Sequence, residues 1–411
     1  MTETVVVVGG GPAGASAAFF MARAGLDVLI LDRARFPRDK PCAEYLSPEA
    51  SRILDAMGVL QAVEGSGAEQ LAGMLVHAPN GCTVHGEFAA DHGYRGFRDR
   101  GLAVRRTVLD AILLDAARGA GARVEEAVRV SDVMRDASGR VRGVEVAGNG
   151  AARAIPGRFV VGADGLRSVI GRRLGLIHKS RWPRRIALVT HYRGVKHADG
   201  FGEMFVESSG YFGVVNVGHG LTNAAVVVPV SRAGGIAGGQ TQFLERWIAE
   251  HPKIADRFRN AERVEPVRAT GPFASAAKRA WSPGAALVGD AADFFDPFTG
   301  EGIYAALRGG EMLAEHVIEY IAENDPERSD EAIRAYDAAR KREFSGKWKI
   351  ERIVGATIGF TPLINRTATV LSRRRDMADL LLGVGGDFVP PKEVLNPGFL
   401  MRVFLSFPRP Q

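Results

Sequence analysis

Apolar runs recur at the start, in the middle and late in the chain. Apolar runs of four or five residues, some led by one charged residue, are typical of strands buried on both faces of a parallel sheet. The clearest runs are Val5–Val8, 27–31 (DVLIL), 158–163 (RFVVGA) and 285–289 (AALVG). Between them, small and apolar residues follow the longer period of a helix. The helices that this period predicts cover residues 15–24, 107–117 and 302–321. The pattern therefore predicts an α/β domain assembled from separated segments.

The pattern changes between residues 186 and 230. Short apolar segments alternate there with glycine and polar turns (IALVTHYRGV, GEMFVES, GYFGVVNVG and TNAAVVVPV), which is typical of an antiparallel sheet. Residues 71–84 add two strand-like pieces around the turn signal Pro79-Asn80-Gly81. After residue 325 the pattern is mainly helical. We expect a Rossmann-type domain built from discontinuous segments, an inserted antiparallel β-sheet domain and a helical C-terminal region.

The first apolar run leads into a glycine-rich turn. Gly9, Gly11 and Gly14 fit the spacing G-x-G-x-x-G, and Asp32 ends the next strand. The first glycine permits a sharp turn, the second lets a pyrophosphate approach the backbone, and the third lets the helix pack on the strand. The helix N-terminus offers free N–H groups to phosphates, and Asp32 can accept hydrogen bonds from a ribose 2′-hydroxyl. These features predict a dinucleotide site. The Asp32 carboxylate would repel a 2′-phosphate and therefore disfavours NADP in this site.

Composition narrows the class of protein. The only cysteines are Cys42 and Cys82, too few for a disulfide framework or a four-cysteine metal site, so we expect a cytoplasmic protein. We interpret the net charge of +6 as scattered arginines rather than a binding surface. No nucleic-acid module and no helical metal-ligand spacing of histidines is present, so neither nucleic acid nor metal is predicted as a partner. No apolar run is long enough to span a membrane.

Two later motifs identify a family resemblance. One is Gly162-Ala163-Asp164-Gly165, and the other joins residues 289–292 (GDAA) to residues 296–303 (DPFTGEGI). With the glycine-rich turn, in this order and spacing, the chain resembles the flavin-dependent monooxygenases of the p-hydroxybenzoate hydroxylase superfamily. Its closest likeness is to the geranylgeranyl reductase-like branch, from Thr4 to about Leu313. The resemblance implies FAD as cofactor and NAD(P)H as electron donor.

The resemblance also assigns residues to FAD. They are Gly9, Gly11, Pro12, Ala13, Gly14, Asp32, Arg33, Cys42, Arg106, Val130, Asp164, Asp290, Gly300, Gly302 and Ile303. Asp290 resembles the aspartate that binds the ribityl chain. Arg106 precedes a helix in the pattern R-x-x-L-D, with Arg105 as the alternative register. Gly300 to Ile303 would open a helix beside the isoalloxazine ring, where its N-terminus would stabilise reduced, anionic flavin.

Residues 40–48 (KPCAEYLSP) resemble a segment close to the flavin in the geranylgeranyl reductase branch. This chain has Ala43 where that branch usually has glycine, and Tyr45 where it often has glycine. These departures argue against prenyl reduction, because they predict a differently shaped pocket beside the ring. We interpret Cys42 as a packing residue rather than a catalytic thiol. Tyr45 could donate a hydrogen bond to a substrate or simply pack.

Three residues are candidates for catalysis. Pro297 would lie near the flavin face where oxygen reacts, Tyr45 would contact the substrate, and His191 could act as a base near a phenolic proton. They fit an NAD(P)H-dependent monooxygenase of secondary metabolism that hydroxylates an aromatic or polyketide-like hydrophobic substrate via a flavin hydroperoxide. The alternative is a flavin-dependent reductase of prenyl or other carbon–carbon double bonds. A non-catalytic FAD-binding module is the alternative of another class.

These assignments divide the chain into three regions. The FAD-binding domain comprises residues 1–75, 104–182 and 273–325, the substrate domain 76–103 and 183–272, and the helical C-terminal region 326–411. Apolar residues of the tail, including Trp348 and Phe360, either pack on the main domains or cover a lipid-like substrate at a membrane surface. The second interpretation places a cytoplasmic protein in peripheral contact with a membrane.

Overall fold

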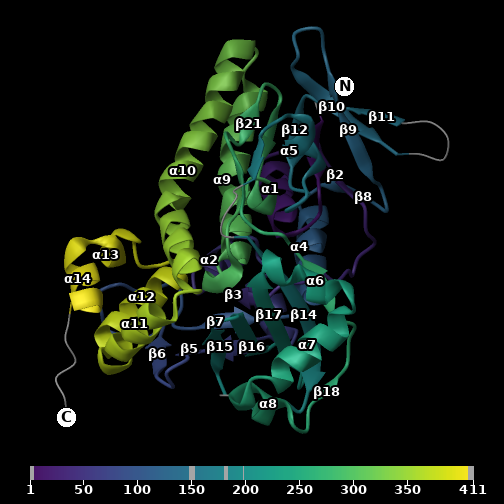
Figure 1. Ribbon diagram of the computed structural model, residues 1–411. Helices are drawn as coiled ribbons and strands as arrows, with labels where there is room; N and C mark the ends of the chain where they lie inside the picture. The colour runs from purple at the N-terminus through teal and green to yellow at the C-terminus, as the bar shows by residue number, and fades with distance from the viewer. Residues whose placement is uncertain (1–3, 148–152, 180–183, 198, 406–411) are drawn as a thin grey trace.

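A six-stranded sheet forms the centre of the first domain in the computed structural model (Figure 1). The structure describes residues 4–147, 153–179, 184–197 and 199–405. The strand order is β21-β22-β12-β1-β2-β8, and all neighbours are parallel except β21 and β22. The strands are β1 (Val5–Val8), β2 (Val28–Asp32), β8 (Arg123–Glu126), β12 (Phe159–Gly162), β21 (Trp281–Ser282) and β22 (Ala285–Leu287). Distant segments of the chain thus build one sheet, as the apolar runs predicted.

Long helices pack against this sheet. They are α1 (Pro12–Arg23), α4 (Arg106–Gly119), α9 (Gly302–Ala322) and α10 (Pro326–Thr357). Helix α1 contacts both α4 and α9, and α10 runs along α9 (Figure 1). Small residues bring α1 and α9 together: a Cβ on Gly310 would lie 2.7 Å from the Ala13 carbonyl oxygen, and the Ser16 hydroxyl donates to the Leu307 carbonyl at 2.8 Å. Two of the three helix predictions hold within two residues at both ends, whereas α1 begins earlier because the fixed φ of Pro12 suits a first turn.

A second sheet of eight strands lies below the first in Figure 1. Its strands are β5 (Gly73–His77), β6 (Thr83–Glu87), β14 (Arg185–Arg193), β15 (Phe201–Glu207), β16 (Gly210–Asn216), β17 (Thr222–Pro229), β18 (Glu262–Arg263) and β19 (Arg268–Thr270). The hairpin predicted at Pro79-Asn80-Gly81 joins β5 to β6. The sheet is not wholly antiparallel, because β5 and β15 pair in parallel. Parallel neighbours need a long connection, which the intervening first-domain segment supplies.

Shorter elements complete the two domains. The remaining strands are β3 (Tyr45–Leu46), β4 (Glu69–Leu71), β7 (Gly101–Ala103), β9 (Val130–Arg135), β10 (Val141–Val146), β11 (Arg153–Pro156), β13 (Ile177–Lys179), β20 (Ser275–Ala277) and β23 (Asp293–Phe294). The remaining helices before residue 300 are α2 (Ala50–Ala56), α3 (Leu60–Gly65), α5 (Val169–Arg173), α6 (Ala233–Ala237), α7 (Gln240–Ala249), α8 (Pro252–Phe258) and the 3-10 turns η1 (Val230–Arg232), η2 (Gly289–Ala291) and η3 (Pro297–Thr299).

The C-terminal helices form an apolar cluster of their own. They are α11 (Thr361–Arg373), α12 (Arg375–Gly385), α13 (Lys392–Leu395) and α14 (Pro397–Leu405). Ile350, Leu371 and Met377 are buried in this cluster, so part of the apolar tail serves packing. Ile353 and Phe360, at the corner between α10 and α11, are instead 47% and 59% exposed. Within the part of the chain that the structure describes, no helix has both the length and the apolarity needed to cross a membrane.

Candidate active site

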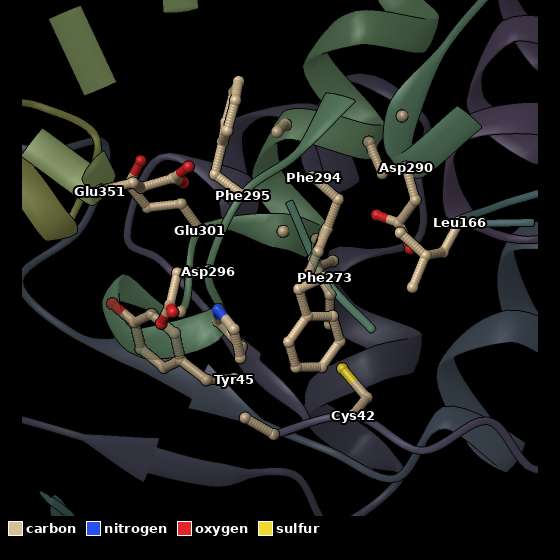
Figure 2. Close-up of a pocket in the computed structure, with 18 of the residues that line it drawn as sticks. Cys42, Tyr45, Leu166, Phe273, Asp290, Phe294, Phe295, Asp296, Glu301 and Glu351 are labelled. Carbon is tan, nitrogen blue, oxygen red and sulfur yellow. The ribbon is translucent and has the colours of Figure 1, made fainter. Parts of the chain in front are cut away.

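One large cavity lies where the two sheets meet α9 and α10 (Figure 2). It encloses about 1610 Å³ of empty space, its open mouth included. Its walls fall into three parts, each named here by its residues. The cofactor channel comprises Pro12, Lys40, Cys42, Arg106, Gly289 and Asp290. The apolar wall comprises Ala187, Val189, Met204, Gly213, Ala225 and Val227. The acidic end comprises Asp296, Glu301, Lys347 and Glu351.

The glycine-rich turn has the close approaches that its spacing predicted. A Cβ on Gly14 would lie 1.9 Å from the Gly9 carbonyl oxygen, and Gly9, at φ +108°, would place a Cβ 2.4 Å from the Ala163 carbonyl. No side chain caps α1, whose N-cap is Gly11 and whose first residue is Pro12. The free N–H groups of the first turn, including that of Ala13, therefore remain for an anion. This arrangement fits an FAD pyrophosphate.

Two arginines border the same turn. A Cβ on Gly11 would lie 3.1 Å from Arg38 Nη2 and 4.0 Å from Arg106 Nη2. Both guanidinium groups pair with the buried Asp110 carboxylate, Arg38 at 3.0 Å and Arg106 at 2.7 and 2.8 Å. Two cations against one carboxylate leave net positive charge that fits a pyrophosphate. Arg105 points away to Glu265 at 2.5 Å, so Arg106 is the arginine of this pair that lines the cavity.

Asp32 ends β2 beside the turn, where dinucleotide folds hold a ribose. Its carboxylate accepts hydrogen bonds from the Gly10 N–H at 2.7 Å and from the Ala34 N–H at 2.8 Å. The backbone preceding Val130 lies alongside, since the Val128 N–H donates to the Asp32 carbonyl at 2.8 Å. Asp32 therefore lies beside the segment that leads into β9, whereas the Arg33 side chain is exposed. Their contacts with FAD stay a prediction.

The two aspartates of the later motifs occupy different positions. Asp290, in η2, lines the cofactor channel and pairs with Lys40 at 2.8 Å. Asp164 follows β12 and accepts hydrogen bonds from the Val169 and Ile170 N–H groups at 2.5 and 3.3 Å. Within the residues that the structure describes, its second oxygen is buried without a hydrogen-bond partner, and burial raises the pKa of the carboxyl. An unpartnered buried oxygen fits a ligand or water held between the motif and the turn.

The loop before α9 projects backbone into the cavity. Gly300 has φ +75°, and a Cβ there would lie 2.8 Å from the Tyr45 ring. Helix α9 begins at Gly302 with no side-chain cap, and Ile303 is buried behind it. Free N–H groups at this end can stabilise a developing anion. Pro297 lines the cavity at the start of η3, as expected of a residue beside the flavin.

The segment after Lys40 brings Cys42 and Tyr45 to the cavity. The Cys42 sulfur points into it (Figure 2) and accepts a hydrogen bond from the Glu44 N–H at 3.3 Å. The Tyr45 hydroxyl is buried and has no hydrogen-bond partner among the described residues. Burial and the charge of Glu301 raise its pKa, so the phenol stays protonated and can donate. The Tyr45 ring lines the cavity and stacks on Phe88, with 6.4 Å between the ring centroids.

His191 occupies a different position from the one predicted. Its Nε2 lies 2.7 Å from Glu44 and its Nδ1 lies 2.9 Å from Glu265, so carboxylates take both ring nitrogens. Asn223 donates to the same Glu44 oxygen at 3.0 Å and to the Cys42 carbonyl at 2.8 Å. His191 does not line the large cavity. The structure therefore places His191 in a positioning network, and its role as a base on the substrate stays a prediction.

That network holds a strained residue. Glu44 has φ 61°, a conformation that is uncommon outside glycine. Its second oxygen accepts a hydrogen bond from the Arg106 N–H at 2.8 Å. The geranylgeranyl reductase branch usually has glycine at the position of Ala43, but the left-handed backbone conformation in this segment is at Glu44. Side-chain hydrogen bonds of Glu44 fix it there. Such local strain persists only where the surroundings over-determine it, as they do here between α4 and the second sheet.

The apolar wall is hollowed by small residues. Met204, Gly213, Ala225 and Val189 follow one another across β15, β16, β17 and β14, and Tyr211, Val227 and Ala187 form the next row. Gly213 and Ala225 are small at the centre of the first row, and Ala187 is small at the end of the second. Phe273, Phe294 and Leu166 line the same cavity (Figure 2) and belong to one apolar cluster with Ala187, Val189 and Val227. The resulting space suits a long apolar substrate.

Several residues of the site were not predicted. Arg38 lies in an irregular segment with no periodic pattern. Glu301 lies in the loop of residues 296–303, here called the flavin loop, and no role was predicted for it. Lys347 and Glu351 belong to a tail interpreted from its apolar residues alone. One signal was present: Glu343, Lys347 and Glu351 recur at four-residue spacing on one helix, which places them on one face.

Comparison with known proteins agrees with this geometry. The family model described as FAD binding domain matches residues 2–345. Digeranylgeranylglycerophospholipid reductase 2 of Methanopyrus kandleri is 31% identical over 396 residues, covering 95% of this chain and 94% of that protein. Menaquinone reductase of Mycobacterium tuberculosis (strain H37Rv) is 32% identical over 331 residues, covering 76% of this chain and 75% of that protein.

Solved structures share the fold. A geranylgeranyl bacteriochlorophyll reductase-like protein from Thermoplasma acidophilum has a TM-score of 0.77 at 24% identity, covering 90% of this chain and 92% of that one. A flavoprotein/dehydrogenase from Cytophaga hutchinsonii has a TM-score of 0.81 at 24% identity, covering 97% and 95%. The chain therefore belongs to the FAD-binding domain family, as an FAD-dependent oxidoreductase of the geranylgeranyl reductase-like branch.

Proposed function

We propose that the protein reduces carbon–carbon double bonds in a prenyl-like lipid. The observation that carries this proposal is the apolar wall, which runs from the flavin loop along the second sheet and is hollowed by Gly213 and Ala225. An extended apolar chain fits such a surface better than a compact polar ring. The names of the relatives, reductases of a geranylgeranyl lipid and of menaquinone, favour the same reaction over the hydroxylation expected from the sequence.

The departures at Ala43 and Tyr45 do not oppose this reaction. The Tyr45 ring lines the cavity against Gly300 and Phe88 and is not one of the residues of the apolar wall. A residue in this position changes the shape of the site without blocking it. The obstacle to prenyl reduction that the Tyr45 departure predicted is therefore small.

Each part of the cavity has a task in this proposal. Bound reduced FAD would supply a hydride. Arg38, Arg106 and the first turn of α1 would bind its pyrophosphate, and Lys40 and Asp290 would border its ribityl chain. The apolar wall would orient the double bond and exclude water. The uncapped α9 terminus would stabilise negative charge on the flavin.

A single-turnover experiment tests the proposal. The FAD-loaded protein is reduced chemically without oxygen and mixed with a geranylgeranyl lipid or a prenylated quinone, while flavin absorbance is followed. Reoxidation with the unsaturated lipid, and none with its fully saturated analogue, is the expected result. Equal reoxidation rates with both lipids would reject double-bond reduction.

We also propose that NAD(P)H reduces the flavin. The motif around Asp164 supports this, because the resemblance associates it with both FAD and the nicotinamide. Anaerobic mixing with NADH and with NADPH tests the donor directly. Bleaching of the flavin by either compound would support the proposal, and bleaching only by a chemical reductant would reject it.

Peripheral contact with a membrane is a further part of the proposal. Ile353 and Phe360 are exposed beside the exposed Arg352, while the neighbouring Ile358 is buried against the apolar wall. A lipid could thus pass from a bilayer to the cavity at this corner. The double variant Ile353→Ser, Phe360→Ser should lose flotation with anionic vesicles. Unchanged flotation, or no flotation of the wild type, would reject the contact.

A further inference from the structure

A line of titratable groups connects the acidic end to a second hollow. Glu343, Lys347 and Glu351 lie on one face of α10. Lys347 is buried, and it lines both the large cavity and a hollow of about 1060 Å³, open mouth included, between α9, α10 and residues 387–391. Glu343 and Asp387 line that hollow. Lys347 therefore stands between the cavity and an outer polar space.

Contacts on both sides of Lys347 are close. Its ammonium pairs with the Asp387 carboxylate, whose other oxygen is buried and has no hydrogen-bond partner in the described part of the chain. The same ammonium lies 3.9 Å from Glu301 Oε2 and 4.4 Å from the centre of the Tyr304 ring. The Tyr304 hydroxyl donates to Glu343 at 3.3 Å. Acidic groups thus flank the lysine toward the cavity and toward the hollow.

The acidic end itself holds three carboxyl groups. Asp296 pairs with Arg185 at 2.5 Å and accepts a hydrogen bond from the Tyr211 hydroxyl at 2.7 Å. Glu301 and Glu351 lie close together (Figure 2), and the charges that act on Glu351 are those of Glu301, Asp296, Lys347 and Arg352. Burial and the neighbouring carboxylates raise the pKa of Glu351, and burial raises that of Glu301. Together they favour a state with a bound proton.

We propose that Glu351, with Glu301, stores the proton used in double-bond reduction, and that Lys347 and Asp387 resupply it from the second hollow. This inference rests on the proposed function. The π bond of the substrate breaks; one carbon receives the hydride from reduced flavin, and the other receives the carboxyl proton. The carboxylate left behind regains a proton through Lys347. The flavin is oxidised by two electrons and the alkene is reduced by two.

Infrared spectroscopy tests the stored proton without turnover. FAD-loaded protein carrying isotope-labelled glutamate should show the labelled carbonyl stretch of a protonated carboxylic acid at neutral pH. Glu351→Gln should abolish this band, while Glu331→Gln, at an exposed position of the same helix, should keep it. A protonated band that survives in Glu351→Gln and in Glu301→Gln, or no band in the wild type, would overturn the inference.

A single-turnover experiment then tests whether the stored proton is used in double-bond reduction. With prereduced flavin, Glu351→Gln should slow saturation of the lipid by roughly 10²-fold, the usual contribution of a general acid, and Glu351→Asp should restore part of the rate. An unchanged rate in Glu351→Gln would overturn the inference even if the lipid is reduced. Conversely, if no lipid is reduced but the infrared band behaves as expected, the proposed function fails while the buried proton store stands.

Discussion

Glu44 Oε2 and His191 Nε2 lie 2.7 Å apart, and this contact ties the segment bordering the cofactor channel to strand β14 of the second sheet. A catalytic base would need a free nitrogen facing the substrate, whereas both nitrogens of His191 hold carboxylates. We therefore expect the histidine to act on the cavity by fixing Glu44. Its effect on the cavity is one of geometry.

The first prediction concerns the pH dependence of this contact. Burial lowers the pKa of His191, but the hydrogen bond and charge of Glu44 and the charge of Glu265 outweigh it, so the net pKa is raised. A raised histidine pKa gives stability that is complete below the unfolded value of 6.5 and is lost as pH rises through the folded value. His191→Gln should cost about 1–3 kcal/mol at low pH and less at high pH, measured by urea unfolding. A cost independent of pH would contradict a charged His191.

The second prediction separates the two neighbouring arginines. Arg106→Ala leaves the buried Asp110 with Arg38 alone and removes a cation from the cofactor channel. We expect a loss of about 3–5 kcal/mol in unfolding free energy and a large rise in the Kd for FAD. Arg105→Ala is the matched control, since Arg105 pairs with the less buried Glu265 outside the channel. Equal FAD affinities of the two variants would contradict the assignment of Arg106.

The third prediction uses the close approach in the glycine-rich turn. Gly14→Ala would set a Cβ 1.9 Å from the Gly9 carbonyl, so α1 must move away from β1. The purified variant should carry little FAD, as measured by the ratio of flavin to protein absorbance. Gly119→Ala, at the end of α4 where a Cβ meets open space, should keep full FAD content. Full occupancy of the Gly14 variant would show that the turn does not position the cofactor.

The fourth prediction concerns the apolar wall. Ala225→Leu fills the hollow between Gly213 and Val189 without introducing charge. It should reduce kcat/KM for a geranylgeranyl lipid about 10-fold, equivalent to about 1.4 kcal/mol, because a long chain must cross this point. For a short prenyl analogue that ends before the hollow, the variant should keep the kcat/KM of the wild type. Equal losses for both substrates would place the binding path elsewhere.

Sequence patterns predicted most of the framework. Val5–Val8 is the strand expected from four valines, and the glycine spacing correctly anticipated the contact between Gly14 and Gly9. Both signals are local, because they depend on neighbours within one strand-turn-helix unit. The parallel pairing of β5 with β15 depends instead on the path of a long connection, which local periodicity does not encode.

The site was harder to predict for the same reason. His191 seemed free on a strand, but Glu44 and Glu265 reach it from distant segments. Arg38 becomes part of the cofactor channel's border only when residues 34–46 fold back over the glycine turn. Glu351 comes under the charge of Glu301, 50 residues away in the chain, through the packing of α10 on α9. Such groupings require tertiary contacts that motif spacing does not contain.

The central claim is that the reduced flavin delivers hydrogen to a carbon–carbon double bond. The most direct measurement is the mass of the lipid product after turnover with NAD(P)H, with and without isotope-labelled oxygen gas. We predict a gain of two hydrogens per double bond, at the same rate without oxygen, and no label in the product. A product that contains labelled oxygen, and forms only when oxygen is present, would contradict the account and establish a monooxygenase.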